Sequence, residues 1–311
     1  MRIFTDHAAV QGAVAEAEAR MAAVAAAHAR RGIPCTDQVF DDEIWLLAPP
    51  QASAPALLLI GGMGPQAGLR AFAQTCARFA QSRRIVLLQA CSIPDRSQAV
   101  RAGLAGEIAG MRARQSVVQA LTGAVQHVRE LAQTASADLI VLCNTAHHFL
   151  GHVPLPPRTR LIDLVDAAAQ HCRGMASAIV LSTYGTRVSG LYLRSLAQQH
   201  VHCLTPPAEM EALLADLVYR GIKAMNPDYA VAMLPVLLQQ LAQWAPHADG
   251  LICGCTEIPL LLGAAHDVHA PWPLIDPLSC ALACLEEDAG ATAAHPLPLG
   301  EEMGHAMHYR S

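Results

Sequence analysis

The sequence predicts an α/β protein made of two similar, pseudo-symmetric α/β domains with mainly parallel sheets, a site in the cleft between them, and an extra N-terminal helical arm. Three observations lead to this expectation. Short apolar runs alternate with helical stretches, two pairs of segments repeat between the halves of the chain, and a proline-rich segment separates the first 55 residues from the rest.

The N-terminal arm is predicted to contain one long helix over residues 8–31. Its larger apolar side chains recur at helical spacing, with charged residues between them. A basic last turn followed by Gly32 and Pro34 is typical of a helix end. The segment 47–55 has three prolines and no periodicity, so residues 1–55 are expected to form an extension of helix plus linker.

Beyond this arm, apolar runs separated by Ala- and Leu-rich helical stretches predict the strands. The runs cover residues 56–62, 84–90, 137–143, 177–183, 199–204 and 248–254. Strands that alternate with helices in this way are typical of βα units, in which helical crossovers join parallel strands.

An internal repeat indicates that these units form two related domains. ALLLIGGMGPQAG (56–68) has the same layout as SAIVLSTYGTRVS (177–189), an apolar run followed by a turn of small residues and a helix. ADLIVLCNT (137–145) likewise matches ADGLICGCT (248–256), and each ends in a Cys and a Thr. The expected division is residues 56–155 with 268–311 for the first domain and 156–267 for the second.

Composition restricts the classes of function. Hydrophobic residues make up 53% of the chain and charged residues 15%, which excludes intrinsic disorder, and the net charge of −5 gives no attraction to nucleic acid or to an anionic membrane. Acidic residues interrupt the N-terminus, so we expect neither a signal peptide nor a membrane span, but a cytoplasmic protein. Its ten cysteines are then expected to be mostly free thiols.

Cys143 and Cys255 stand out because the repeat places both at carboxyl ends of strands, where open α/β sheets bind ligands. A single cysteine at a buried strand end is ordinarily a packing residue. Two thiols facing one cleft instead suit the removal of a proton from one face of a carbon and its return to the other. A strand-to-helix turn is expected to lower the pKa of each thiol.

No metal or organic cofactor is expected. His148 and His152 have helical i, i+4 spacing and Cys253 with Cys255 form a CxC pair, but neither pair has further ligands nearby in the sequence. GGMGPQAG follows a strand as a phosphate loop would, yet it lacks the GxGxxG spacing and the Walker lysine.

The chain resembles the aspartate/glutamate racemase family, and specifically its aspartate racemase branch, over residues 56 to 285. Six motifs in order carry the resemblance: IGGMGPQAG (60–68), SIPDRS (92–97), CNTAH (143–147), STYGTRVSGLY (182–192), GIK (221–223) and GCTEIPLL (254–261). The combination of CNTAH with GCTE is the most specific of these features. Residues 1–55 lie outside the resemblance.

The resemblance implies racemisation of an amino acid, aspartate or glutamate above all, by the two cysteines without pyridoxal phosphate, commonly in a homodimer. It implies a first-domain wall, a cradle for the substrate's carboxylate and amino groups, and two cations for a side-chain carboxylate. The wall is assigned to Met63, Gly64 and Pro65, and the two cations are Arg96 and Lys223. The cradle is assigned to Asn144, Thr145, Thr183, Gly185, Thr186 and Thr256. His147 and Glu257 follow the two cysteines closely and are expected to tune them or to make capping hydrogen bonds.

Other readings stay open at this stage. Hydantoin racemases, maleate isomerases and arylmalonate decarboxylases belong to the same superfamily and reuse one or both cysteines, and an amino-acid-binding protein without catalysis is a further alternative. The arm at residues 1–55 is expected to pack on the first domain or to extend a dimer interface.

Overall fold

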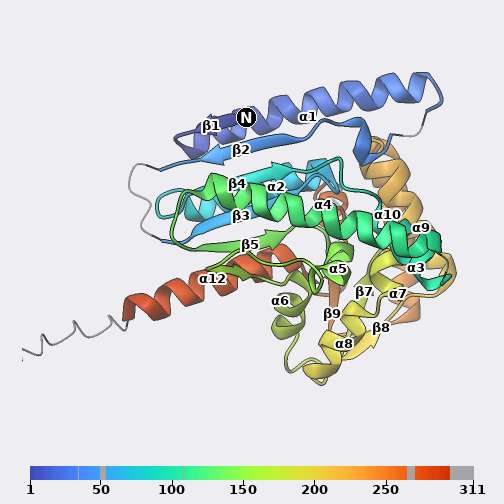
Figure 1. Ribbon diagram of the computed structural model, residues 1–311. Helices are drawn as coiled ribbons and strands as arrows, with labels where there is room; N and C mark the ends of the chain where they lie inside the picture. Colours follow the sequence, from blue (N-terminus) through green and yellow to red (C-terminus); the bar gives the residue numbers. More distant parts are fainter. Residues whose placement is uncertain (34, 50–53, 107, 265–269, 295–311) are drawn as a thin grey trace, which may run out of the picture.

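The computed structural model describes residues 1–33, 35–49, 54–106, 108–264 and 270–294 of the chain (Figure 1). It contains two sheets flanked by helices, and all strand pairs but one are parallel. The predicted α/β class, with two mainly parallel sheets and an N-terminal helix, is therefore confirmed. Within the described part of the chain, no helix combines the length and the apolar character needed to cross a membrane.

The first sheet has six strands in the order β1-β2-β4-β3-β5-β6. Only the β2–β4 pair is antiparallel. The strands are β1 (Arg2–Phe4), β2 (Glu43–Leu47), β3 (Ala56–Gly61), β4 (Ile85–Gln89), β5 (Ala137–Val141) and β6 (Thr159–Leu161).

The second sheet has four parallel strands in the order β10-β9-β7-β8. They are β7 (Ser177–Leu181), β8 (His202–Leu204), β9 (Gly250–Cys253) and β10 (Leu274–Ile275).

Helices connect the strands and cover the sheets. The α-helices are α1 (His7–Arg30), α2 (Pro65–Phe79), α3 (Arg96–Leu104), α4 (Ile108–Ala132), α5 (His147–Leu150), α6 (Leu164–His171), α7 (Tyr184–Val188), α8 (Leu191–Gln198), α9 (Ala208–Asp216), α10 (Pro227–Trp244), α11 (Ile258–Ala264) and α12 (Pro277–Ala294). Two short 3₁₀ helices, η1 (Asp37–Val39) and η2 (Asn144–Ala146), and a π-helical segment, η3 (Leu217–Ile222), complete the described elements.

Each of the six predicted apolar runs contains a strand, and the structure adds β1, β2, β6 and β10. Two of these added strands cross the expected domain limits. β6 pairs with β5 in the first sheet although it follows residue 155, and β10 pairs with β9 in the second sheet although it follows residue 268. The chain therefore changes sheets between β6 and β7, and leaves the second sheet only after Ile275.

The central strand β3 shows why these runs are apolar throughout. Leu57 and Leu59 point into the core on the face covered by α1, α2 and α12, while Leu58 and Ile60 point into the core under α4. Successive side chains of a strand alternate between faces, so a sheet covered by helices on both faces needs apolar residues at every position.

The N-terminal extension is more than the expected helix and linker. Asp6 caps α1 by accepting a hydrogen bond from the amide of Ala9 (2.9 Å), and α1 packs along α2 (Figure 1). β1 and β2 then extend the first sheet, with the ring of Trp45 5.4 Å from that of Phe4 and 5.9 Å from that of Phe72. The expectation of helix plus linker is corrected here, because the extension also contributes strands to the core.

This architecture brings four strand ends together. β3, β5, β7 and β9 are inner strands of the two sheets, and each leads into one of the motifs that the sequence singled out. The carboxyl ends of parallel strands are where α/β sheets form their binding sites. The fold therefore directs the search for a site to these four ends.

Candidate active site

One cavity lies where these strand ends meet, and side chains from both halves of the chain line it. The lining residues are Met63, Asp95, Arg96, Ser97, Cys143, Asn144, Thr145, Thr183, Thr186, Tyr219, Lys223, Cys255, Thr256 and Glu257. Both cysteines that the repeat singled out are among them. The geometry therefore brings two thiols from sequence-distant turns to a single cavity.

The two cysteine turns have the same backbone hydrogen bonding. The carbonyl of Cys143 accepts a hydrogen bond from the amide of Ala146 (3.0 Å), and that of Cys255 accepts one from Ile258 (3.0 Å). Each cysteine thus begins a short helical turn directly after its strand, and each is only 8% exposed. The repeat seen in the sequence extends to the hydrogen bonds of these turns.

On the first-half side, Arg96 lies beside Cys143. Burial by itself would lower the pKa of the Arg96 guanidinium, but its interactions with Cys143 and with the carboxylate of Asp37 outweigh burial and raise that pKa. Arg96 therefore remains a cation while 8% of its side chain is exposed, and it places positive charge next to the first thiol.

On the second-half side, Cys255 lies beside a carboxylate. Its Sγ donates a hydrogen bond to Oε2 of Glu257 (2.9 Å). Burial, and then the charge and hydrogen bond of Glu257, raise the pKa of Cys255 well above that of an ordinary thiol. The expectation that both turns lower the thiol pKa is thus wrong for Cys255, since burial and a neighbouring negative charge exceed the effect of the turn.

Polar groups for a substrate line the cavity between the thiols. Oγ1 of Thr145 lies 2.7 Å from Oγ1 of Thr186 and 3.4 Å from that of Thr183, so these hydroxyls connect the two halves. Tyr192 donates to Oδ1 of Asn144 (2.7 Å), which leaves Nδ2 of Asn144 buried and without an acceptor among the described residues. A substrate carboxylate would supply that acceptor.

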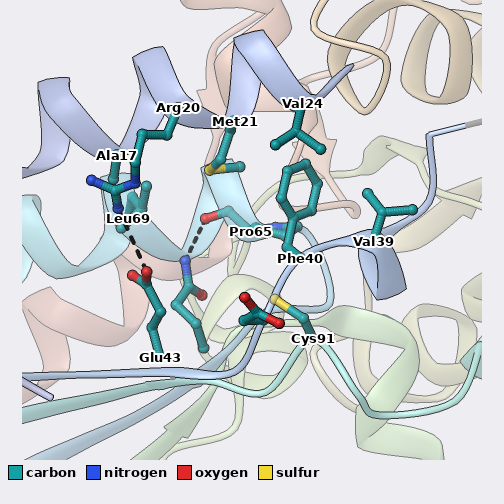
Figure 2. A pocket seen from close by; sticks show the side chains of 12 residues that line it. Ala17, Arg20, Met21, Val24, Val39, Phe40, Glu43, Pro65, Leu69 and Cys91 are labelled. Carbon is teal, nitrogen blue, oxygen red and sulfur yellow. Dashed lines mark hydrogen bonds and ion pairs between the residues drawn. The ribbon is translucent and has the colours of Figure 1, made fainter. Parts of the chain in front are cut away.

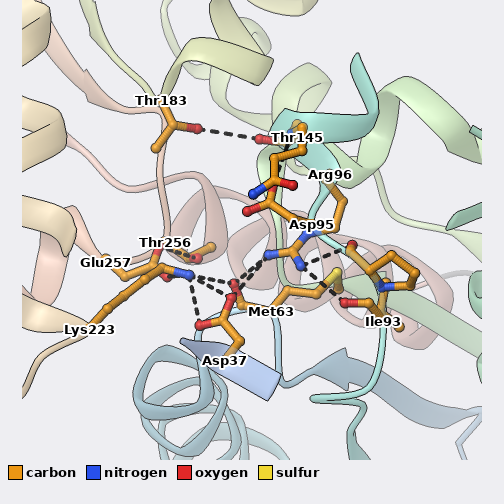
Figure 3. A network of polar contacts seen from close by, with 12 residues as sticks. Asp37, Met63, Ile93, Asp95, Arg96, Thr145, Thr183, Lys223, Thr256 and Glu257 are labelled. Atoms are coloured by element: carbon orange, nitrogen blue, oxygen red, sulfur yellow. Dashed lines mark hydrogen bonds and ion pairs between the residues drawn. The ribbon is translucent and has the colours of Figure 1, made fainter. Parts of the chain in front are cut away.

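A buried charge network closes the other end of the cavity (Figure 3). Nζ of Lys223 lies 2.8 and 2.7 Å from the two carboxylate oxygens of Asp37 and 3.4 Å from Oε1 of Glu257. Nη2 of Arg96 lies 3.3 Å from Oδ2 of Asp37 and donates to the carbonyl of Met63 (2.9 Å). The two cations expected to hold a side-chain carboxylate are therefore brought together, but around a carboxylate of the chain itself.

Four predicted site residues do not line the cavity. Gly64 and Pro65 lie behind its wall, and Gly64 matters because a Cβ there would overlap Oε1 of Glu257. A Cβ at Gly185 would come within 2.7 Å of Cγ2 of Thr145, so this glycine lets the halves approach. Nδ1 of His147 lies 3.0 Å from Oδ2 of Asp163, away from the thiols.

The sequence analysis missed three residues of the lining and Asp37 behind it. Asp95 and Ser97 flank Arg96 within SIPDRS, so the motif itself was the signal available for them. Tyr219 precedes the GIK motif, and Nζ of Lys223 lies 5.8 Å from the centre of its ring. Asp37 belongs to η1 of the extension, which no motif covers.

A second pocket lies beside this site, between α1 and the strands below it (Figure 2). Met21, Phe40 and Pro65 line this pocket and also a smaller one that reaches Asp37, Lys223 and Glu257. The extension therefore lies against the charged residues at one end of the cavity that holds the cysteines.

Comparison with known proteins agrees with the fold. The aspartate racemase of Picrophilus torridus has a similar fold, with a TM-score of 0.57 and 19% identity over 76% of this chain and 95% of that one. An aspartate racemase homologue from Pyrococcus horikoshii gives a TM-score of 0.53 and 17% identity over 76% and 100%. The model of the family described as Asp/Glu/Hydantoin racemase matches residues 60–285. The chain therefore belongs to the Asp/Glu/hydantoin racemase family.

Proposed function

We propose that the protein racemises a free amino acid without a cofactor, with Cys143 and Cys255 as the acid/base pair. The observation that supports this most directly is that both thiols line one cavity from opposite halves of a pseudo-repeat. Inverting a stereocentre requires a base on one face of the α-carbon and an acid on the other. As the family resemblance implies, we also propose that the chain acts as a homodimer.

The charges around the thiols support a starting protonation state. Because burial and Glu257 raise the pKa of Cys255, we assign Cys255 as the acid in the first direction, and we assign Cys143, which lies beside the cation of Arg96, as the base. Cys143 takes the α-proton, the electron pair stays on the α-carbon, and Cys255 returns a proton to the opposite face. The reverse reaction uses the two residues in exchanged roles.

Stabilising the carbanion is the demanding part of a reaction without an electron-sink cofactor. Charge that develops at the α-carbon delocalises into the α-carboxylate, so donors to that carboxylate stabilise the transition state. Nδ2 of Asn144 and the hydroxyl of Thr145 supply such donors in the cavity, while the hydroxyl of Thr256 donates to Oε2 of Glu257 (3.2 Å). These donors are in place before substrate binds, which reduces the reorganisation that the reaction requires.

The side chain of the substrate needs separate treatment. The sequence favours aspartate or glutamate because Arg96 and Lys223 match a second carboxylate. Both cations already contact Asp37, so we propose amino acids as the substrate class and consider their side chain below.

Solvent exchange tests this proposal. The purified protein, incubated in D₂O with each chiral amino acid in turn, should remove the α-proton signal of at least one of them and generate its enantiomer, as followed by NMR and chiral chromatography. Activity should persist after treatment with a chelator and after removal of pyridoxal phosphate. Absence of α-proton exchange with every amino acid would contradict the proposed racemisation and favour a different reaction or a binding protein.

A further inference from the structure

Asp37 is an internal carboxylate at the end of the active-site cavity. It lies on η1, in the extension that precedes the segment matched by the family model. Both of its oxygens lie within hydrogen-bonding distance of Nζ of Lys223, and Oδ2 also accepts from Arg96 (Figure 3). Only 12% of its side chain is exposed, so solvent screens these ion pairs weakly.

Most donors of the two cations are used within the protein. The Nη1 atom of Arg96 donates to the carbonyls of Ile93 and Pro94, and its Nη2 atom donates to the carbonyl of Met63 and to Asp37. These contacts use the four hydrogens on the two Nη atoms, and the fifth donor, on Nε, is buried and takes no part in them. A single remaining N–H leaves no bidentate grip for a substrate carboxylate. Lys223 likewise directs its donors to Asp37 and to Met63.

The charge balance of the cavity also disfavours a further carboxylate. Arg96 and Lys223 contribute two positive charges, and the carboxylates of Asp95 and Glu257 in the lining offset them. Asp37 adds one more negative charge at 2.7 Å from Nζ of Lys223. A side-chain carboxylate of the substrate at this end would meet an excess of negative charge. A side-chain ammonium would instead come close to the cations of Arg96 and Lys223.

Asp37 is held in place from both sides along the chain. The amide of Phe40 donates to its carbonyl (3.3 Å), and that of Val39 donates to the carbonyl of Thr36 (3.2 Å). Phe40 packs against the core, and its ring points into the pocket under α1 (Figure 2). β2 begins three residues later and pairs with β4. These contacts hold Asp37 in place against Lys223 and Arg96, behind the lining of the cavity.

We propose that Asp37 is a specificity-determining residue that occupies the subsite for a side-chain carboxylate, so that the substrate is an amino acid with an uncharged side chain rather than aspartate or glutamate. This inference rests on the proposed racemisation. The cysteines and cations of the site match the aspartate racemase motifs. Under this proposal, the N-terminal extension changes the substrate class by contributing Asp37.

The test compares substrate preference before and after the charge is removed. For the unmodified protein, kcat/KM for α-proton exchange in D₂O should be at least about tenfold higher for alanine, serine or methionine, whichever is best, than for aspartate and glutamate. Asp37→Asn keeps the size of the side chain and should raise the ratio of aspartate to uncharged-substrate kcat/KM by at least about tenfold. Asp41→Asn, an exposed carboxylate on the same segment, is the matched control and should leave this ratio unchanged.

A binding measurement separates this inference from the proposed function. Succinate carries two carboxylates spaced as in aspartate, and calorimetry should show it binding at least about tenfold more tightly to the Asp37→Asn variant than to the unmodified protein. This result would support the occupied subsite even if no amino acid were racemised. Equal succinate affinity, or an unmodified protein that prefers aspartate or glutamate to every uncharged amino acid, would overturn the inference while leaving racemisation intact.

Discussion

The turn after β5 and the turn after β9 have the same backbone hydrogen bonds, but the charged side chains next to their cysteines differ. Cys143 and Cys255 begin equivalent helical turns with equivalent hydrogen bonds. Arg96 lies beside the first thiol, whereas Glu257 accepts a hydrogen bond from the second. The repeat therefore fixes where the two thiols lie, while the charged side chains beside them differ.

This difference suits a reaction in which one cysteine must be protonated, to act as the acid, while the other is deprotonated, to act as the base. Two thiols in identical surroundings would have the same intrinsic pKa, so neither would be favoured as the acid. Burial and the Glu257 carboxylate raise the pKa of Cys255, and such differences in surroundings assign acid and base roles to chemically identical groups.

Replacing either cysteine should have the largest effect on racemisation, because it removes one of the two acid/base groups. Cys143→Ala and Cys255→Ala should each lower kcat for racemisation by at least about 1000-fold in both directions, because each direction uses one residue as base and the other as acid. Chiral chromatography from either enantiomer measures this.

Cys172→Ala is the matched control for thiol replacement. This cysteine is buried in the core and does not line the cavity, so the variant should retain its activity. Near-normal racemisation by either Cys143→Ala or Cys255→Ala would rule out the two-thiol mechanism.

Removing the negative charge of Glu257 should reduce the electrostatic difference between the two cysteine turns. Glu257 raises the pKa of Cys255, so Glu257→Gln should lower that pKa. Cys255 then becomes a thiolate at lower pH, and its alkylation by iodoacetamide should accelerate at a correspondingly lower pH. Mass spectrometry of the peptide that contains Cys255 resolves this reaction from that of the other cysteines.

The control for this charge is Glu287→Gln, which alters an exposed carboxylate on α12 and should leave the alkylation profile unchanged. An alkylation midpoint that stays in place, or moves to higher pH, in Glu257→Gln would contradict the electrostatic role of Glu257.

The smallest expected effect concerns the support behind the Cys143 turn. Burial would raise the pKa of Asp163, but the charge and hydrogen bond of His147, with two backbone amides, lower it to about 2. A carboxyl whose pKa is lowered by folding stabilises the protein above its unfolded pKa and loses this contribution as the pH falls through the folded value. The contribution is therefore complete above about pH 4 and disappears towards pH 2.

Asp163→Asn should accordingly lower the free energy of unfolding by about 1–2 kcal/mol at neutral pH, a value reduced for the 31% exposure of the side chain. Urea unfolding at a series of pH values measures the difference, which should shrink as the medium is acidified. A difference that persists undiminished near pH 2 would show that the ion pair is not its source.

Much of the fold and most of the cavity could be predicted because their signals are local. Buried strands such as β3 and β9 are continuous apolar runs, and the CNTAH and GCTE segments place the cysteines at strand ends. Helix α1 was also predictable, since its spacing and its end signals lie within one segment. These features depend on neighbours in sequence.

Asp37 and β2 could not be predicted because their partners are distant. Asp37 is an isolated carboxylate between a helix and a strand, and its partner Lys223 lies 186 residues away along the chain. β2 is a short apolar run after three acidic residues, and nothing in β4 shows that it takes a further neighbour on its outer side. The protonation of Cys255 likewise depends on tertiary burial, which periodicity does not report.

The pairing of β2 with β4 has a consequence for how the chain can be divided. Without residues 1–49, β4 (Ile85–Gln89) would become the outer strand of its sheet and would present unpaired amides and carbonyls on a strand whose first four residues are apolar. Exposed apolar edges of this kind recruit strands from other molecules. The family model matches residues 60–285, which leave out β1 and β2. We therefore expect a protein trimmed to that segment to aggregate rather than to remain a smaller enzyme.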